Sequence, residues 1–377
     1  MLVKKFKMKC LVTGCAGFIG SNLLEKLLSE GHSVIGIDNL STGKLDFMSQ
    51  SLDNNSFKFI KSDLKDIKNL ISKIEDVEIV FHLAANADVR FGLNNPSRDL
   101  TENTINTFKL LEAMREINIK NIIFASTGSI YGNTNEIPTI ESCSFPSQTS
   151  LYGASKVSAE AFLSAYCEGF KMNAVSCRFV SLLGPRYTHG HVFDFVKSLI
   201  KDSKELIILG DGKQYKSYFH ISDCINAIMI LSKNLIDKTI EGFLPINLGT
   251  EEGITVEKSA SIICSVLNKK PKFIFTGGSR GIGEMIARAF LVNGAVVYIS
   301  SRKEKDCNAT AQRLTEECSS KCISMPEDIS TLKCGHVFHT RCIFYLFEQG
   351  KCPICRKPIK INYKVGKLLD KKLLKSL

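Results

Sequence analysis

Four polar residues near the middle of the chain could together oxidise an alcohol. Ser126 and Thr127 end the apolar run NIIFAST, and Tyr152 and Lys156 stand four positions apart in LYGASK. Side chains at this spacing share one face of a helix. A tyrosine with its ordinary pKa of about 10 is a poor base, but a neighbouring ammonium favours the phenolate. We expect Tyr152 to take the proton of a substrate hydroxyl that Thr127 hydrogen-bonds, while hydride leaves the adjacent carbon.

A glycine-rich turn near the N-terminus could hold the cofactor that accepts the hydride. The run KCLVT leads into Gly14, Gly17 and Gly20, and the helix-like run SNLLEKLLSE follows. In such a strand, turn and helix, the glycines let the backbone approach a pyrophosphate on the helix N-terminus. A lone glycine triplet is also typical of an ordinary turn. Asp38, about twenty residues further on, is placed to bond the adenosine ribose and to repel a 2′-phosphate, which favours NAD over NADP.

Strand-like and helix-like patterns alternate through residues 1–272, which predicts an α/β fold with a doubly wound parallel sheet of Rossmann type. KFIKSDL is expected to be a third strand that Asp63 ends. EIVFHLAA is a fourth strand, followed by a small-residue turn, and NIIFAST is a fifth. An amphipathic helix is expected over residues 103–116. Open α/β sheets bind ligands at the carboxyl ends of their strands, so we expect the site at that edge.

These segments resemble the extended short-chain dehydrogenase/reductase family, and within it the nucleotide-sugar epimerases of the UDP-glucose 4-epimerase type. The resemblance covers residues 8–272 and rests on TGCAGFIGSNL, IDNLSTG, SDL, FHLAA, FASTGSIYG, YGASK, RFVSLLGPR, GDGKQYKSYFHISD and NLG. It implies tightly held NAD and a hydride that leaves C4 of a nucleotide-linked sugar and returns to the other face of the ketone. It also implies a homodimer. Related 4,6-dehydratases carry an Asp-Glu pair where Gly128 and Ser129 stand, so dehydration is disfavoured, as is the uronate decarboxylase branch.

The resemblance also implies a role for individual residues. The catalytic residues would be Thr127, Tyr152 and Lys156. The residues that bind the cofactor would be Gly14, Gly17, Phe18, Ile19, Gly20, Asp38, Asn39, Asp63, Leu64, Ala84, Ala85, Asn103, Ser126, Tyr152 and Lys156. The substrate would contact Thr127, Ser181, where many relatives have Asn, and Lys216, where an Arg often binds the diphosphate.

A second glycine fingerprint, FTGGSRGIG, opens residues 273–330. A strand-like AVVYISSRK, a helix-like ATAQRLTEEC and a strand-like CISMPEDIS follow. This order resembles the start of the compact short-chain reductases, in which Arg302 would suit NADP. No catalytic Ser or second Tyr–Lys pair follows within residues 273–330, so we expect only a partial βαβ nucleotide-binding segment. We also expect the substrate lobe, mainly residues 178–272, to be truncated at this join, although the inserted segment could instead substitute for the missing part.

Six Cys and His residues in segment 331–377 have the spacing of a zinc site. They read Cys334-x-His336-x2-His339-x2-Cys342 and Cys352-x2-Cys355. They resemble the later part of a RING-H2 finger, which implies one complete tetrahedral zinc site made by Cys334, His336, Cys352 and Cys355. His339 and Cys342 would be half of a second site, for which Cys318 and Cys322 are the nearest upstream candidates.

Three functions are therefore open. The main hypothesis is an NAD-dependent nucleotide-sugar 4-epimerase. The first alternative is a zinc-binding RING-type ubiquitin ligase or interaction module that contacts a ubiquitin-conjugating enzyme. The second is a composite chain that binds NAD without a complete activity.

Charge and cysteine distribution limit the class of protein. The net charge of +11 is concentrated in residues 356–377, which hold eight Lys or Arg and one Asp. A solvated basic tail is the favoured interpretation, so no nucleic-acid partner is expected. Seven of the fourteen cysteines are scattered through the first 270 residues, as is typical of free thiols in a reducing compartment. No secretion signal or membrane-spanning run is recognisable, and we expect a cytoplasmic protein.

Overall fold

The computed structural model describes residues 7–89, 92, 95–132, 134, 136, 138–144, 147–208, 212–275, 288, 291, 297–300, 304–318, 320–325, 329–331 and 337–339. The chain divides into two compact units. The first comprises Met1–Lys197 with Tyr215–Ile254, and the second Ser198–Gln214 with Thr255–Leu377. The domain boundaries expected at residues 272 and 330 stay predictions.

A seven-stranded sheet forms the centre of the first unit, and its neighbouring strands all run parallel. Its strands are β1 (Lys9–Thr13), β2 (Ser33–Asp38), β3 (Phe57–Lys61), β4 (Ile79–His82), β5 (Asn121–Thr127), β6 (Asn173–Phe179) and β10 (Phe243–Leu248). Their order is β10-β6-β5-β4-β1-β2-β3. The strand order reverses between β1 and β4, which is the point where doubly wound sheets bind dinucleotides. The predicted Rossmann-type α/β fold is confirmed.

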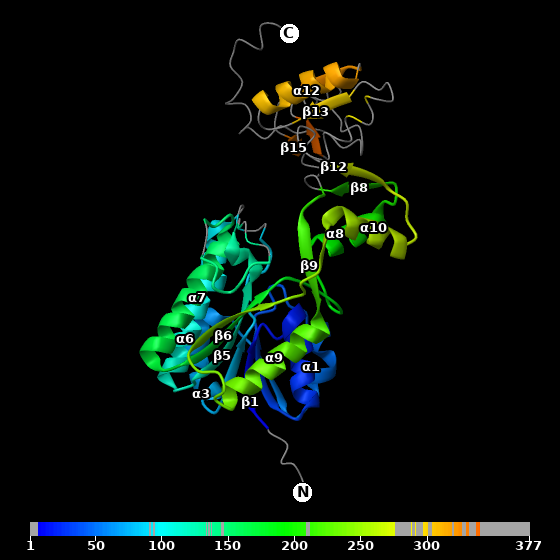
Figure 1. Ribbon diagram of the computed structural model, residues 1–377. Helices are drawn as coiled ribbons and strands as arrows, with labels where there is room; N and C mark the ends of the chain where they lie inside the picture. The colour runs from blue at the N-terminus through cyan, green and yellow to red at the C-terminus, as the bar shows by residue number, and fades with distance from the viewer. Residues whose placement is uncertain are drawn as a thin grey trace, which may run out of the picture. The chain divides into compact units, whose positions relative to one another are not determined.

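Helices cover both faces of this sheet, and side chains of β1 alternate between them. Cys10 and Val12 pack in the apolar cluster with α1 and α9, whereas Leu11 packs on the other face with α3, α6 and α7 (Figure 1). Burial on both faces explains why the strands read as continuous apolar runs. The helices of the first unit are α1 (Phe18–Ser29), α2 (Ser49–Leu52), α3 (Ile71–Ile74), α5 (Pro96–Asp99), α6 (Asn106–Glu116), α7 (Leu151–Phe170) and α9 (Ile221–Ile236).

Shorter elements complete the first unit and lead into the second. The 3-10 turns are η1 (Leu45–Met48), η2 (Leu64–Leu70) and η4 (Gly128–Tyr131), and η3 (Leu100–Ile105) is a π-helix. A three-stranded sheet has the order β11 (Gly253–Thr255), β9 (Tyr215–His220) and β7 (Ser181–Leu183). Helix α8 (His191–Lys201) spans the boundary of the two units.

Three elements begin or end elsewhere than the pattern predicts. β3 ends at Lys61, because the Asp63 carboxylate accepts a hydrogen bond from the Lys65 amide and so begins η2. β4 ends at His82. The helix expected from residue 103 begins as the π-helix η3, and α6 follows from Asn106. The Asn103 amide bonds across to other segments, and single π-turns of this kind are frequent at functional sites.

The second unit contains short paired strands. β8 (Glu205–Ile208) pairs in parallel with β12 (Lys272–Phe275), and α10 is Val256–Val266. β13 (Val297–Ser300) pairs in parallel with β14 (Cys322–Met325), and α12 (Glu304–Cys318) lies between them in sequence. β15 (Ile329–Thr331) and β16 (Val337–His339) are antiparallel. A strand, helix and strand are thus present where the second fingerprint predicts them. Within the described part of the chain, no helix is both long and apolar enough to cross a membrane.

Candidate active site

The glycine turn between β1 and α1 is packed too closely for any side chain. Gly14 has a φ of +72°, and a Cβ atom there would lie 2.7 Å from the Ala84 amide nitrogen. A Cβ at Gly20 would lie 2.1 Å from the Gly14 carbonyl oxygen. Gly17 begins α1, where no side chain caps the helix and no acidic residue stands in the first turn. The free amides of that turn therefore fit a pyrophosphate.

Acidic residues follow the glycine turn at the ends of the next two strands. Asp38 accepts hydrogen bonds from the Ala16 amide at 2.9 Å and the Leu40 amide at 2.8 Å, which ties it to the glycine turn. Asp63 accepts from the Asn39 side chain at 3.0 Å. Each carboxylate oxygen can accept further hydrogen bonds, so this edge suits the ribose and base of a dinucleotide. Leu64 is buried beside it.

Tyr152 lies in the first turn of α7, which Ser150 begins by accepting a hydrogen bond from the Gly153 amide at 3.0 Å. Burial raises the pKa of Tyr152 to about 12, and a hydrogen bond with the Thr127 side chain opposes that shift. Thr127 stands at the end of β5, where its hydroxyl accepts from the Ser129 amide at 3.1 Å. The tertiary structure thus brings together Thr127 and Tyr152, as predicted.

Lys156 is buried one turn after Tyr152. Its ammonium donates to the Ala125 carbonyl oxygen at 2.7 Å and lies 4.6 Å from the centre of the Phe124 ring. Burial lowers the pKa of Lys156 to about 7, although the charges of Glu160 and Asp99 raise it. Lys156 can therefore gain or lose a proton near neutral pH, as a group that tunes a catalytic base should.

A buried ion pair lies behind Lys156, and sequence reasoning missed it. Glu160 accepts hydrogen bonds from Arg178 at 2.8 Å, from Ser176 at 2.8 Å and from Ser126 at 2.5 Å. Arg178 also donates to the Tyr131 hydroxyl at 2.7 Å, in the turn after Thr127. The network therefore ties α7 to β5 and β6. The sequence feature that could have indicated this ion pair is the charged residue at position 160, one helical turn after Lys156.

His82 connects β1, β4 and α6 at the point where the strand order reverses. The Thr107 hydroxyl donates to the Asn103 carbonyl oxygen at 2.6 Å, so it must accept from His82 Nε2, which lies 2.9 Å away. His82 Nδ1 then accepts from the Thr13 hydroxyl at 2.8 Å. Burial, and then the charge of Lys156, lower the pKa of His82 to about 3, which keeps the ring neutral.

Other predicted cofactor residues differ in what they contact. The Ser126 hydroxyl donates a hydrogen bond to Glu160, and the side-chain amide of Asn103 donates to Ser155 at 2.9 Å. Phe18 and Ile19 form the first turn of α1, and the Phe18 ring meets Tyr187 edge-on at 5.6 Å. Ala85 follows Ala84 in the turn after β4. The side chains of Ser126 and Asn103 therefore hold α7 in place through Glu160 and Ser155.

Two of the predicted substrate-binding residues, Ser181 and Lys216, lie in the three-stranded sheet. Ser181 begins β7 and pairs with Tyr218 of β9, and Lys216 is exposed two positions before Tyr218. The Tyr218 hydroxyl and His191 Nε2 lie 2.7 Å apart. Burial, and then the nearby Lys216 charge, lower the pKa of His191 to about 4, so His191 is neutral at neutral pH.

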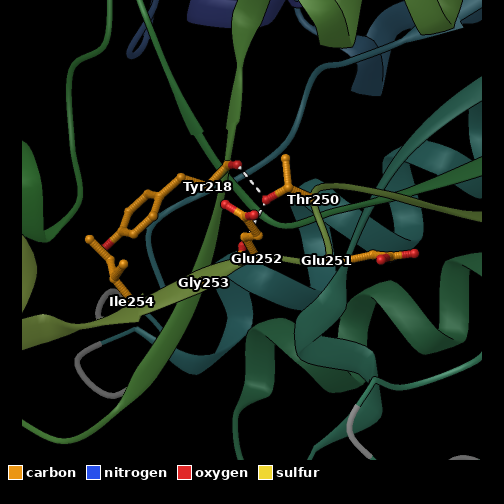
Figure 2. A pocket seen from close by; sticks show the side chains of 6 residues that line it. All are labelled: Tyr218, Thr250, Glu251, Glu252, Gly253 and Ile254. Carbon is orange, nitrogen blue, oxygen red and sulfur yellow. Dashed lines mark hydrogen bonds between the residues drawn. The ribbon is translucent and has the colours of Figure 1, made fainter.

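A pocket of about 590 Å³ lies beside β9, lined by Tyr218 and residues 250–254 (Figure 2). The Thr250 hydroxyl donates to the carbonyl oxygens of Tyr218 and Glu252. Glu251 and Glu252 make this pocket acidic, which does not suit an anionic diphosphate. It contains neither Tyr152 nor Thr127, so we place the reaction at the strand ends instead.

The predicted zinc ligands fall mainly outside the described residues. These are Cys334, His336, Cys342, Cys352 and Cys355, whereas the backbone of His339 lies in β16. Cys322 packs instead in a small apolar core with Cys307 and Leu314, against which Cys318 is half-buried. Within the described residues, no group of three His, Cys, Asp or Glu side chains could hold a metal ion.

The parallel sheet, the glycine turn and the Tyr152–Lys156 pair define a Rossmann-type, dinucleotide-dependent enzyme. Residues 10–241 match the NAD dependent epimerase/dehydratase family, and residues 272–335 match the short chain dehydrogenase family. The chain belongs to the NAD dependent epimerase/dehydratase family. The second match agrees with the predicted partial reductase segment.

Known proteins similar to this chain include epimerases with related sequences and structures. An uncharacterized UDP-glucose epimerase of Bacillus subtilis is 36% identical over 71% of this chain and 85% of that protein. The UDP-glucose 4-epimerase of Mycolicibacterium smegmatis is 33% identical over 59% of this chain and 72% of that protein. The structure of the UDP-glucuronic acid 4-epimerase of Bacillus cereus, in complex with UDP-glucuronic acid and NAD, has a TM-score of 0.65 at 31% identity, covering 71% of this chain and 86% of that chain.

The close packing of the glycine turn makes Gly20→Ala a sharp test of the cofactor site. The added methyl would meet the Gly14 carbonyl oxygen and move the turn away from the pyrophosphate. We expect at least a tenfold loss of NAD affinity, about 1.4 kcal/mol, by fluorescence titration. Gly169→Ala is the matched control, because a Cβ at Gly169 meets nothing within 4 Å. Equal NAD affinity in the two variants would contradict the assignment.

Proposed function

We infer that this chain is an NAD-dependent epimerase that inverts C4 of a nucleotide-linked sugar. The observation that carries the inference is the cluster of Thr127, Tyr152 and Lys156 at the strand ends, on the same edge as the glycine turn. Relatives named UDP-glucose 4-epimerase and UDP-glucuronate 4-epimerase support the substrate class. The absence of carboxylates at Gly128 and Ser129 argues against dehydration.

The cofactor residues proposed for NAD belong to the first unit. They are Gly14, Gly17, Phe18, Ile19, Gly20, Asp38, Asn39, Asp63, Leu64, Ala84, Ala85, Asn103, Ser126, Tyr152 and Lys156. NAD, when bound, supplies a hydride acceptor that returns the same hydride. The uncapped first turn of α1 would hold its pyrophosphate, and Asp38, which accepts a hydrogen bond from the Ala16 amide, would bind the ribose hydroxyls.

The proton is handled by the chain itself. Tyr152 takes the proton of the sugar C4 hydroxyl and gives it back after the ketone has turned over. Thr127 hydrogen-bonds the same hydroxyl and holds it beside Tyr152. The Lys156 ammonium lowers the energy of the Tyr152 phenolate through its positive charge. Ser181 and Lys216 are proposed to bind the nucleotide-sugar. Lys216 would attract the diphosphate as a point charge, without the two parallel hydrogen bonds that an arginine guanidinium can donate.

Tyr152→Phe tests the assigned base. Removal of the hydroxyl leaves no group to accept the proton, so we expect kcat for UDP-glucose and UDP-galactose interconversion to fall by roughly 10²–10⁴-fold. Because Tyr152 is also a proposed cofactor residue, NAD affinity is measured in the same variant, and the loss of kcat should exceed any loss of NAD affinity. Tyr166→Phe is the control on the same helix, since its hydroxyl donates to Glu112 at 2.6 Å. Undiminished interconversion in Tyr152→Phe would refute the mechanism.

The substrate lobe is proposed to be incomplete and the chain to be a composite. The epimerase match ends at residue 241, and the short chain dehydrogenase match begins at residue 272. β12 lies within the second match yet pairs with β8, which precedes it by more than sixty residues. These observations support a junction of two sequence families near β12.

We also propose that two copies associate through α6 and α7, which lie side by side (Figure 1). Lys156 and Glu160, the charged residues of α7 before Glu168, are both 2% exposed, so the outer side of residues 151–167 carries no charge. Phe108 and Phe162 are exposed on this face, with ring centres 5.6 Å apart and ring planes tilted by 56°. A solvated helix normally carries charge on its outer side.

A second copy is the occupant that we propose for this face, because the uncharged outer side of α7 can complement itself across a two-fold axis, while Glu112 and Arg115 of α6 pair with each other at 2.9 Å. Helix α7 is about 30 Å long and α6 about 16 Å long, so two helices about 10 Å wide present roughly 460 Å². A pair of such faces buries about 920 Å², which is at the low end of specific interfaces.

Phe162→Glu should separate the proposed dimer. A charge at the centre of the face would be buried without a partner, so we expect a monomer by sedimentation velocity. Ile230→Glu is the control, because Ile230 is exposed on α9. A wild-type protein that sediments as a monomer would overturn the proposal, as would a dimer of the Phe162→Glu variant.

The zinc module remains a second proposal, which the spacing of its Cys and His residues supports. We propose one zinc ion held by Cys334, His336, Cys352 and Cys355, and contact with a ubiquitin-conjugating enzyme if the module is a working RING finger. Metal analysis of the purified chain should find one zinc per chain, lost in Cys352→Ser and kept in Cys143→Ser. Two zinc ions would indicate a completed RING, whereas none in the wild type would contradict the module.

A further inference from the structure

Asp99 is a buried carboxylate with no assigned role. It lies at the end of α5 and is 1% exposed. Its Oδ1 accepts a hydrogen bond from Asn86 Nδ2 at 2.7 Å, whereas its Oδ2 is buried without a hydrogen-bond partner. Buried carboxylates that lack a partner cost stability, so each one calls for an explanation.

A continuous set of hydrogen bonds leads from Asp99 to the catalytic helix. The backbone amide of Asn86, whose side chain donates to Asp99, donates to Asn103 Oδ1 at 2.9 Å. Asn103 Nδ2 donates to Ser155 Oγ at 2.9 Å, and Ser155 Oγ donates to the Tyr152 carbonyl oxygen at 2.8 Å. The carboxylate is thus connected to the first turn of α7 through side chains of two other segments.

The free oxygen of Asp99 also lies close to the start of α7. A Cβ atom at Gly92 would be 2.4 Å from Asp99 Oδ2 and 3.2 Å from the Leu151 Cβ. Position 92 therefore leaves no room for a side chain between α5 and α7. Leu151 immediately precedes Tyr152, so the unpaired oxygen lies beside the turn that carries the proposed base.

The groups that act on Lys156 come from every element around it. Its own helix contributes Glu160, whose charge is shared with Arg178 of β6. β4 contributes His82, which is neutral, and β5 contributes the Ala125 carbonyl. α5 contributes Asp99. Among the described residues, Glu160 pairs with Arg178, whereas no ion pair involves Asp99, so the Asp99 charge is the less compensated of the two carboxylates.

We propose that Asp99 is a positioning residue of the epimerisation site, whose buried carboxylate is the counter-charge that keeps Lys156 an ammonium beside Tyr152. The proposal rests on the epimerase function inferred above. The negative charge of Asp99 raises the pKa of both Lys156 and Tyr152. Without it, Lys156 would lose its proton at a lower pH, and the phenolate would lose the ammonium that stabilises it.

Asp99→Asn in the full-length, NAD-loaded protein tests this role. The amide keeps the shape and the contact with Asn86 but removes the charge. We expect the pKa of Lys156 and of Tyr152 to fall by about one unit each. The ratio of kcat at about pH 8 to kcat at about pH 6, with UDP-glucose, should then fall about fivefold. Asp53→Asn, an exposed aspartate, is the matched control and should leave the ratio unchanged.

Two further measurements separate this role from a structural one. The ultraviolet absorbance of the Tyr152 phenolate, with Tyr152→Phe as the blank, should titrate about one unit lower in Asp99→Asn, without any need for turnover. The thermal midpoint of the variant should fall more at about pH 6, where Lys156 is charged, than at about pH 8, since the buried ammonium loses its counter-charge. Asp99→Ala provides a second uncharged variant if Asp99→Asn does not fold.

An unchanged pH ratio and an unchanged phenolate titration in a folded variant would overturn the proposal. A lower thermal midpoint with a wild-type pH ratio would also overturn it, because Asp99 would then be purely structural. If the wild type does not interconvert UDP-sugars, the proposed function fails, while the phenolate titration still decides the role of Asp99.

Discussion

The burial of one ammonium ion shapes the first unit. Lys156 is 2% exposed, and taking such a charge out of water is costly unless other groups compensate. A carbonyl of β5, the face of Phe124 and the carboxylates of Glu160 and Asp99 supply that compensation. Glu160 then requires Arg178, which in turn binds the turn after Thr127. The charge that tunes Tyr152 is therefore also the reason why the surrounding strands and turns are tied together.

The close approach of backbone segments to one another is the second constraint on the first unit, and it acts at the glycine turn between β1 and α1. Gly14 lies against the turn after β4, and Gly20 of α1 lies against the Gly14 carbonyl oxygen, so neither position has space for a Cβ. His82 fixes the same junction through two threonine hydroxyls, in one neutral tautomer. The cofactor cradle and the proton-handling residues thus share the reversal point between β1 and β4.

The second unit shows how little a glycine fingerprint determines alone. The strand, helix and strand from Val297 to Met325 share a small apolar core, whereas the first sheet has large clusters on both faces. Residues 273–330, which the second fingerprint opens, contain no Tyr–Lys pair at the spacing of Tyr152 and Lys156. A phosphate-binding turn becomes an active site only where a covered sheet brings catalytic side chains to its edge, and the first unit alone meets that condition among the described residues.

The sequence by itself determined the fold class, the glycine turn and the position of Tyr152 and Lys156 on one helix, because these depend on apolar periodicity and on spacing along the chain. It also placed Asp38 and Thr127 at strand ends. The tertiary structure decided what the remaining side chains do. Ser126 and Asn103 turn toward Glu160 and Ser155, and Asp99 becomes a buried carboxylate beside the start of α7. Ser126 and Glu160 lie 34 residues apart along the chain, and Asn103 and Ser155 lie 52 apart. Contacts over such separations are set by the packing of elements from different parts of the chain, which local spacing does not specify.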